Sequence, residues 1–137
     1  MVSFAIKFTQ SESAPVMNKT PDNKPITPVA VRVQILNGCG AAGIAGKFKQ
    51  YLADAGKPEF IIDVIDAKNF ESFKQEHTLL IARKDNLVQA QKLAEKIGVA
   101  AEQVSQKAME DNFLDIEYSL VVGADYDKFL SRKLDRN

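Results

Sequence analysis

Residues 31–43 read VRVQILNGCGAAG, and this stretch decides the fold. Its first six residues alternate branched apolar side chains with Arg32 and Gln34, which is the pattern of a strand with one buried face. Asn37-Gly38-Cys39-Gly40 follows as a turn signal. Apolar residues then recur at helical spacing at Ile44, Phe48, Tyr51, Leu52 and Ala55. We therefore predict a strand, a glycine-rich turn and a helix in direct succession.

Further elements follow toward the C-terminus. We predict strands at 60–65, 78–82 and 118–122, a second helix from Leu87 to Ile97 capped by Asp85 or Asn86, and a short closing helix within 126–134. Residues 66–77 are expected to form a polar loop, and residues 99–111 are a loop or hold a short strand around Val104. The order β-α-β-β-α-β predicts an α/β fold of the α+β two-layer sandwich type. It has four strands and both helices on one face, which leaves the other face open to a partner.

The composition divides the chain into three parts. Four of the five prolines precede Ala30 and all seven glycines follow it, so residues 1–30 are expected to be a membrane-proximal stub and a Pro-rich linker. The domain proper is expected at 31–127, followed by a tail or short helix at 128–137. Residues 2–8 (VSFAIKF) are either the trimmed end of a signal anchor or an added strand.

The charge and residue counts exclude several classes of protein. Eighteen basic and eighteen acidic residues give zero net charge, which argues against a nucleic-acid partner. A single cysteine, Cys39, and a single histidine, His77, exclude disulfides, thiolate zinc sites and multi-histidine metal centres, so no metal or cofactor is expected. Both residues are expected to be structural or solvated rather than catalytic.

The glycine turn has competing interpretations. Gly38, Gly40 and Gly43 match the G-x-G-x-x-G fingerprint of dinucleotide binding, and Asp63 lies 20 residues beyond Gly43, where a ribose-binding acid belongs. The later strands are too few for a mononucleotide-binding half, however. A phosphate-binding P-loop is disfavoured because Phe48 stands where a Ser or Thr would ligate magnesium. A purely architectural turn is favoured, because the Asn37 side chain can hydrogen-bond the local backbone.

The same turn also carries a family resemblance. Residues 33–38 (VQILNG), with Gly40, Gly43 and Ala45, resemble the opening motif of the LytR C-terminal (LytR_C) domain. Residues 120–126 (LVVGADY) are similar to its closing motif, which makes Asp125 a motif residue. Cys39 departs from the family pattern, as does the long polar loop at 68–77.

This resemblance implies a setting rather than a reaction. The family occurs in bacterial cell-envelope proteins, either behind a LytR/CpsA/Psr catalytic domain or alone behind a membrane anchor, and this chain resembles the second arrangement. We therefore expect a non-enzymatic, extracytoplasmic, membrane-anchored binding module. Its expected ligand is peptidoglycan, another wall polymer or an envelope protein. The candidate binding or structural residues are Asn37, Gly38, Gly40, Gly43 and Asp125.

Two alternatives stay open beside that expectation. One is a small nucleotide-binding regulatory domain that uses the glycine turn. The other is a structural dimerisation module that uses the last strand or the loop carrying Phe70 and Phe73. Those two phenylalanines either hold the loop against the core or form an exposed contact patch.

Overall fold

The computed structural model describes residues 27–131, and the stub at 2–8 lies outside the described residues. Its strands and helices, in chain order, are β1 (Val29–Asn37), α1 (Ile44–Ala55), β2 (Phe60–Asn69), β3 (Leu79–Ala82), α2 (Leu87–Ile97), the 3₁₀ turn η2 (Ala101–Gln103), β4 (Val104–Gln106), β5 (Tyr118–Val122) and α3 (Tyr126–Leu130). None of the helices within 27–131 is long and apolar enough to cross a membrane.

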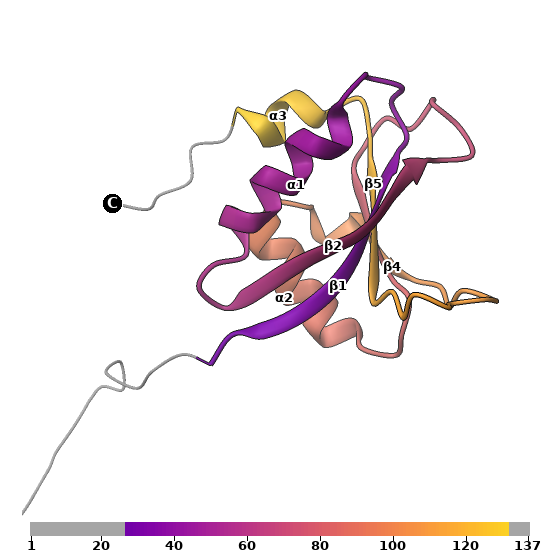
Figure 1. Cartoon of the computed structure of the whole chain (residues 1–137). Coiled ribbons are helices and arrows are strands. Elements are labelled where there is room, and N and C mark those ends of the chain that lie inside the picture. Colours follow the sequence, from indigo (N-terminus) through magenta and orange to yellow (C-terminus); the bar gives the residue numbers. More distant parts are fainter. Residues whose placement is uncertain (1–26, 132–137) are drawn as a thin grey trace, which may run out of the picture.

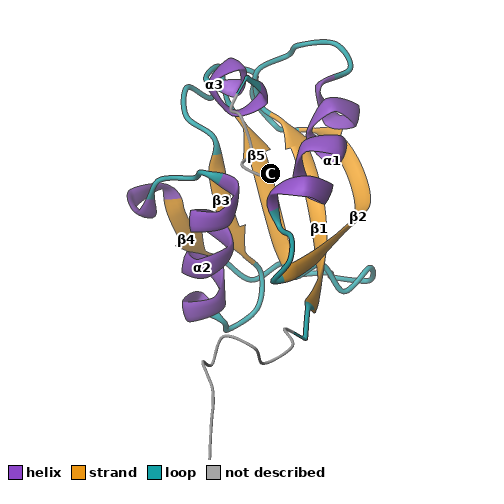
Figure 2. Ribbon diagram, turned by 90° about the vertical axis from the view of Figure 1, so that its left-hand side faces the viewer, coloured by secondary structure: helices purple, strands orange, loops and turns teal. Residues whose placement is uncertain are grey.

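The five strands form one sheet in the order β2-β1-β5-β3-β4. β1 lies between β2 and β5 and is parallel to both, whereas β3 is antiparallel to β5 and parallel to β4. The chain thus contains two β-α-β units, β1-α1-β2 and β3-α2-β4, with β5 inserted between them. Figure 1 shows the helices on one side of the sheet, and Figure 2 looks onto that side.

The hydrophobic core lies between the helices and this face of the sheet. Alternate residues of β1 point into it (Val31, Val33 and Ile35), as the period of two in the sequence predicts. The apolar faces of both helices, centred on Phe48 and Leu93, cover them. The Asn86 side chain caps α2 by accepting a hydrogen bond from the Gln89 backbone N–H, and Gly98 ends this helix with φ +93°.

The predicted α+β fold class is confirmed. The prediction of four strands is wrong, because the sheet has five. The strand added to the predicted four is β4. It has three residues and pairs only with β3, and two of its three side chains are exposed. The sequence pattern offers this strand only as an alternative to a loop, the short strand around Val104, because a strand of that kind carries no alternation of apolar and polar residues. β2 also continues four residues into the predicted polar loop, because its backbone pairs with β1 as far as Asn69 whatever its side chains are.

The parallel strands give the domain two distinct ends. β1 and β2 run from an amino end, where Val29 and Phe60 lie, to a carboxyl end, where Asn37 and Asn69 lie. β5 runs in the same direction beside the second half of β1, from Tyr118 opposite Val33 to Val122 opposite Asn37. A nine-residue strand such as β1 separates the two ends by about 30 Å.

Candidate functional site

The glycine turn lies at the carboxyl end, directly after β1. The Asn37 Oδ1 atom accepts hydrogen bonds from the backbone N–H groups of Cys39 (3.1 Å) and Gly40 (2.9 Å), and Asn37 Nδ2 donates to the Ala41 carbonyl (3.0 Å). These are the backbone donors that a phosphate would otherwise use. The geometry therefore gives Asn37 an architectural role, and ligand binding at this turn stays a prediction.

The position of Gly38 is set by close packing. Its N–H donates to the Val122 carbonyl (2.9 Å), and its own carbonyl accepts from the Gln75 N–H (3.0 Å). A Cβ atom at position 38 would lie 2.8 Å from the Val122 oxygen, so only glycine fits. Gly40 and Gly43 have φ values of +80° and +72°, a backbone conformation that other residues rarely adopt.

The acid proposed for ribose binding does not reach this turn. Asp63 pairs in register with Arg32, five residues before Asn37, which places it roughly 16 Å from the carboxyl end. Phe73, from the polar loop, is half-exposed and packs beside Gly40. The other loop phenylalanine, Phe70, is half-buried. The loop therefore packs against the glycine turn through Phe73, and the exposed part of the same ring forms an aromatic surface.

Asp125 anchors the neighbouring corner of the carboxyl end. Its Oδ1 accepts hydrogen bonds from Thr78 Oγ1 (2.7 Å) and from the Thr78 N–H (3.0 Å), and its Oδ2 lies 3.2 Å from the same N–H. Thr78 Oγ1 in turn accepts from the Gly123 N–H (3.0 Å). Two segments distant in sequence, at Thr78 and at 123–125, are joined here through the hydroxyl of an almost fully buried residue.

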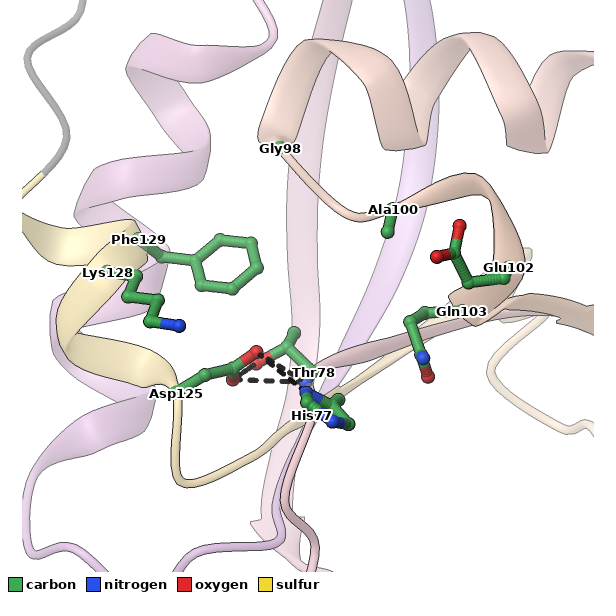
Figure 3. A pocket seen from close by; sticks show the side chains of 9 residues that line it. All are labelled: His77, Thr78, Gly98, Ala100, Glu102, Gln103, Asp125, Lys128 and Phe129. Carbon is green, nitrogen blue, oxygen red and sulfur yellow. Dashed lines mark hydrogen bonds and ion pairs between the residues drawn. The ribbon is translucent and has the colours of Figure 1, made fainter.

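A cavity of about 410 Å³ opens beside this corner. Figure 3 shows Lys128 and the Phe129 ring on one side, Ala100, Glu102 and Gln103 on the other, and Asp125, Thr78 and His77 across the bottom. The His77 Nδ1 atom lies 3.9 Å from Asp125 Oδ2. The cavity therefore presents an ammonium, two carboxylates, an amide and an imidazole around an aromatic ring.

An aromatic cluster holds the wall of this cavity that carries Phe129 in place. Phe129 packs against Phe48 (ring centroids 5.9 Å apart) and Tyr51 (6.4 Å) of α1. The Tyr51 hydroxyl donates to the Ile97 carbonyl at the end of α2 (2.7 Å). The cavity wall formed by α3 is thus joined to both long helices, which makes it a preformed site.

A polar row crosses the face of the sheet opposite the helices. The centre of this face is buried at Gln34, Leu36, Ser119 and Val121, so the expectation that the face is open is wrong there. Arg83 Nε donates to Ser119 Oγ, Ser119 Oγ donates to Gln34 Oε1, and Gln34 Nε2 donates to Asp66 Oδ2, each over 2.8 Å. Gln34 and Ser119 are buried, so the row is a satisfied network rather than a set of solvated groups. Partial burial lowers the pKa of the Arg83 guanidinium from its ordinary value.

The sequence patterns identified only part of these groups. The structure brings Asn37, Gly38 and Asp125 together at the carboxyl end through Val122 and the loop at 74–78. Glu102 and Gln103 were missed because they lie in the segment at 99–111 that was predicted as a loop or a short strand, and Lys128 because it begins the predicted tail or short helix at 128–137. Within residues 27–131 no three His, Cys, Asp or Glu side chains gather as a metal site.

These features define a small α+β domain with a preformed polar cavity at one end. The family model described as "LytR cell envelope-related transcriptional attenuator" matches residues 30–126. The chain belongs to this LytR_C family, as its opening and closing motifs indicated, and the family is related to the cell envelope. Comparison with curated proteins and with solved structures gives no match.

Proposed function

We propose that this protein is a non-catalytic, extracytoplasmic binding module of the bacterial cell envelope, tethered to the membrane, whose cavity at Asp125 contacts peptidoglycan or another wall polymer. The observation that carries the proposal is the lining of the cavity. Lys128 faces it from α3 and Glu102 faces it from η2, with Asp125 between them.

The chemistry of the lining suits the peptide and sugar groups of a cell wall. Stem peptides present carboxylates, amides and amines. The Lys128 ammonium can donate charge-assisted hydrogen bonds to a carboxylate, the Glu102 carboxylate can accept them from an amine, and the Gln103 amide can pair with an amide. The sugars present hydroxyls and apolar ring faces, and the Phe129 ring supplies an apolar surface for them. A few polar groups around an apolar floor are typical of a small-molecule site.

The environment of Thr78 supports a binding role over a catalytic one. Its hydroxyl is 2% exposed and holds both Asp125 and the Gly123 N–H, so it is not available as a nucleophile. The thiol of Cys39, the single cysteine, donates to Asn37 Oδ1 (3.4 Å) within the glycine turn. Neither group is activated by a neighbouring base in the manner of a hydrolase.

Co-sedimentation with purified peptidoglycan sacculi tests this function. The chain is expected to pellet with sacculi, and Lys128→Glu or Glu102→Lys is expected to weaken pelleting at least tenfold, because each places a like charge against a ligand group. Glu110→Lys, an exposed acid at the other end of the domain, is the matched control for Glu102→Lys and is expected to pellet normally. Absence of pelleting by the parent chain, or equal loss in the control, would exclude this cavity as the wall-binding site.

A further inference from the structure

Exposed apolar side chains gather at the amino end of the sheet, opposite the cavity. Among residues 27–131, seven large hydrophobic residues are exposed, and six lie at this end: Val29, Ile61, Leu87, Val88, Phe113 and Leu114. Phe113 is 91% exposed and Val88 is 72% exposed. The seventh, Phe73, is 52% exposed and lies at the carboxyl end beside Gly40.

Contacts between elements show that these residues share one end. Val29 and Val88 line the same groove, which has a volume of about 520 Å³. The Leu114 carbonyl accepts a hydrogen bond from Arg32 Nη2 (2.7 Å), and Arg32 is the fourth residue of β1. The apolar groups therefore come from the starts of β1, β2 and α2 and from the β4–β5 loop.

The β4–β5 loop holds Phe113 outward on an ordered backbone. Asn112 exchanges two hydrogen bonds with Ile116 (2.8 and 2.7 Å), and Ile116 is buried. Asp115 pairs with Lys84 from the β3–α2 connection. In Figure 1 this loop projects away from the helices at the lower right. Phe113 is thus presented by the fold, and such an apolar tip marks a contact surface.

The chain also enters the domain at this end. The described residues begin at Thr27, which lines the same groove as Val29 and Val88, so residues 1–26 join the domain there. A tether to a membrane through those residues brings the amino end, and not the cavity, nearest to the lipid.

We propose that the amino end of the domain rests on a lipid bilayer, with Phe113 and Leu114 inserted at the membrane interface and Val88 at the same end of the domain. This inference rests on the proposed function, because it takes the tether from there. In this orientation the cavity at Asp125 points away from the membrane, toward the wall, about 30 Å further out.

The charges at this end make the insertion hydrophobic rather than electrostatic. Two of the basic groups here are paired with acids, Lys84 with Asp115 and Lys96 with Glu59. Glu110 and Asp111 also lie just before Phe113 in the chain. Among the described residues, acids and bases are thus mixed at this end and attract anionic lipid little, so binding is expected on neutral lipid and to survive about 1 M salt.

A single tryptophan reports the insertion directly, since the chain has none of its own. Phe113→Trp and the matched control Phe73→Trp are made in the full chain and mixed with phosphatidylcholine vesicles. We expect the emission of Phe113→Trp to shift to the blue and to be quenched by brominated acyl chains, at low and at high salt. The emission of Phe73→Trp is expected to stay unchanged.

A partition measurement supplies the second readout. Phe113→Ser is expected to lower the partition coefficient of the full chain about tenfold or more, the value for withdrawing one phenylalanine from an apolar phase, and Phe73→Ser to leave it unchanged. Both positions are more than half exposed, so the variants are expected to fold.

Several results would overturn the proposal. An unshifted Phe113→Trp spectrum would assign the amino end to a protein partner, and equal responses at positions 113 and 73 would remove the orientation. Binding that vanishes at high salt would make the contact electrostatic. Pelleting with sacculi separates the two proposals, because Phe113→Ser is expected to lose lipid binding and still pellet as the parent chain does. A parent chain that fails to pellet while Phe113→Trp still inserts into lipid contradicts only the proposed function.

Discussion

Replacing Thr78 by valine tests whether the Asp125 corner holds the carboxyl end together. The substitution keeps the shape of the side chain and removes the hydroxyl, which donates to Asp125 and accepts from the Gly123 N–H. Leaving a buried N–H without a partner costs about 1–3 kcal/mol, and the lost bond to a carboxylate contributes about 1.5–3 kcal/mol. Asp125 keeps the Thr78 N–H, so we expect a net loss of about 3 kcal/mol in the free energy of unfolding.

Urea denaturation followed by circular dichroism measures this loss. At roughly 4 °C per kcal/mol for a domain of this size, the thermal midpoint is expected to fall by about 10 °C. Thr78→Ser keeps the hydroxyl and removes one methyl group, so it is the matched control, with an expected loss of about 1 kcal/mol. The reasoning is refuted if Thr78→Val is no less stable than Thr78→Ser, because the hydroxyl would then contribute nothing.

Three further predictions concern other parts of the domain. Burial and the neighbouring Glu117 raise the pKa of Tyr118 to about 12. The contribution of the neutral Tyr118 hydroxyl to the free energy of unfolding is therefore fully present below pH 10 and is lost as pH rises through 12. Absorbance titration is expected to show one late tyrosine that Tyr118→Phe removes. The Lys84 ammonium lowers the pKa of Asp115 below its usual 3.8, so this contact is lost as pH falls through that lowered value, and Lys84→Gln is expected to return the carboxyl pKa, read by NMR, to its ordinary range. Ser119→Ala leaves buried Gln34 without its donor and is expected to cost about 1–3 kcal/mol in urea denaturation, whereas a cost near zero would show that the polar row adds no stability.

The elements predicted from the sequence are those whose apolar residues recur with the period of a strand or helix and all lie on the buried face. The alternation around Val33 and the helical spacing around Phe48 gave β1 and α1, because both segments bury one face in the core. Strand β4 was predicted only as an alternative to a loop around Val104, because it is three residues long at the sheet edge and only Val104 packs against the core. Asn37 was predicted to stabilise its own turn, and the structure shows those hydrogen bonds, since they join residues adjacent in sequence.

The candidate site was less accessible to sequence reasoning. Asp125 was found through its motif, but its partner Thr78 lies 47 residues away, and only the packing of β3 beside β5 joins them. Glu102 and Lys128 face one cavity because α2 and α3 end near each other in space. The periodicity of a short stretch of sequence does not show which distant segments pack together. Glu102 and Lys128 are therefore recognised as neighbours only in the folded structure.

The most direct test of the account is to locate the wall ligand on the domain by NMR. Titration of the isotope-labelled chain with soluble muropeptides released from sacculi reports which backbone amides respond. The account predicts shifts centred on the cavity, at Thr78, Gln103 and Lys128, with the amides around Phe113 unaffected. Shifts centred on Ser119 and Gln34, on the face of the sheet opposite the helices, or no shifts at all, would contradict it.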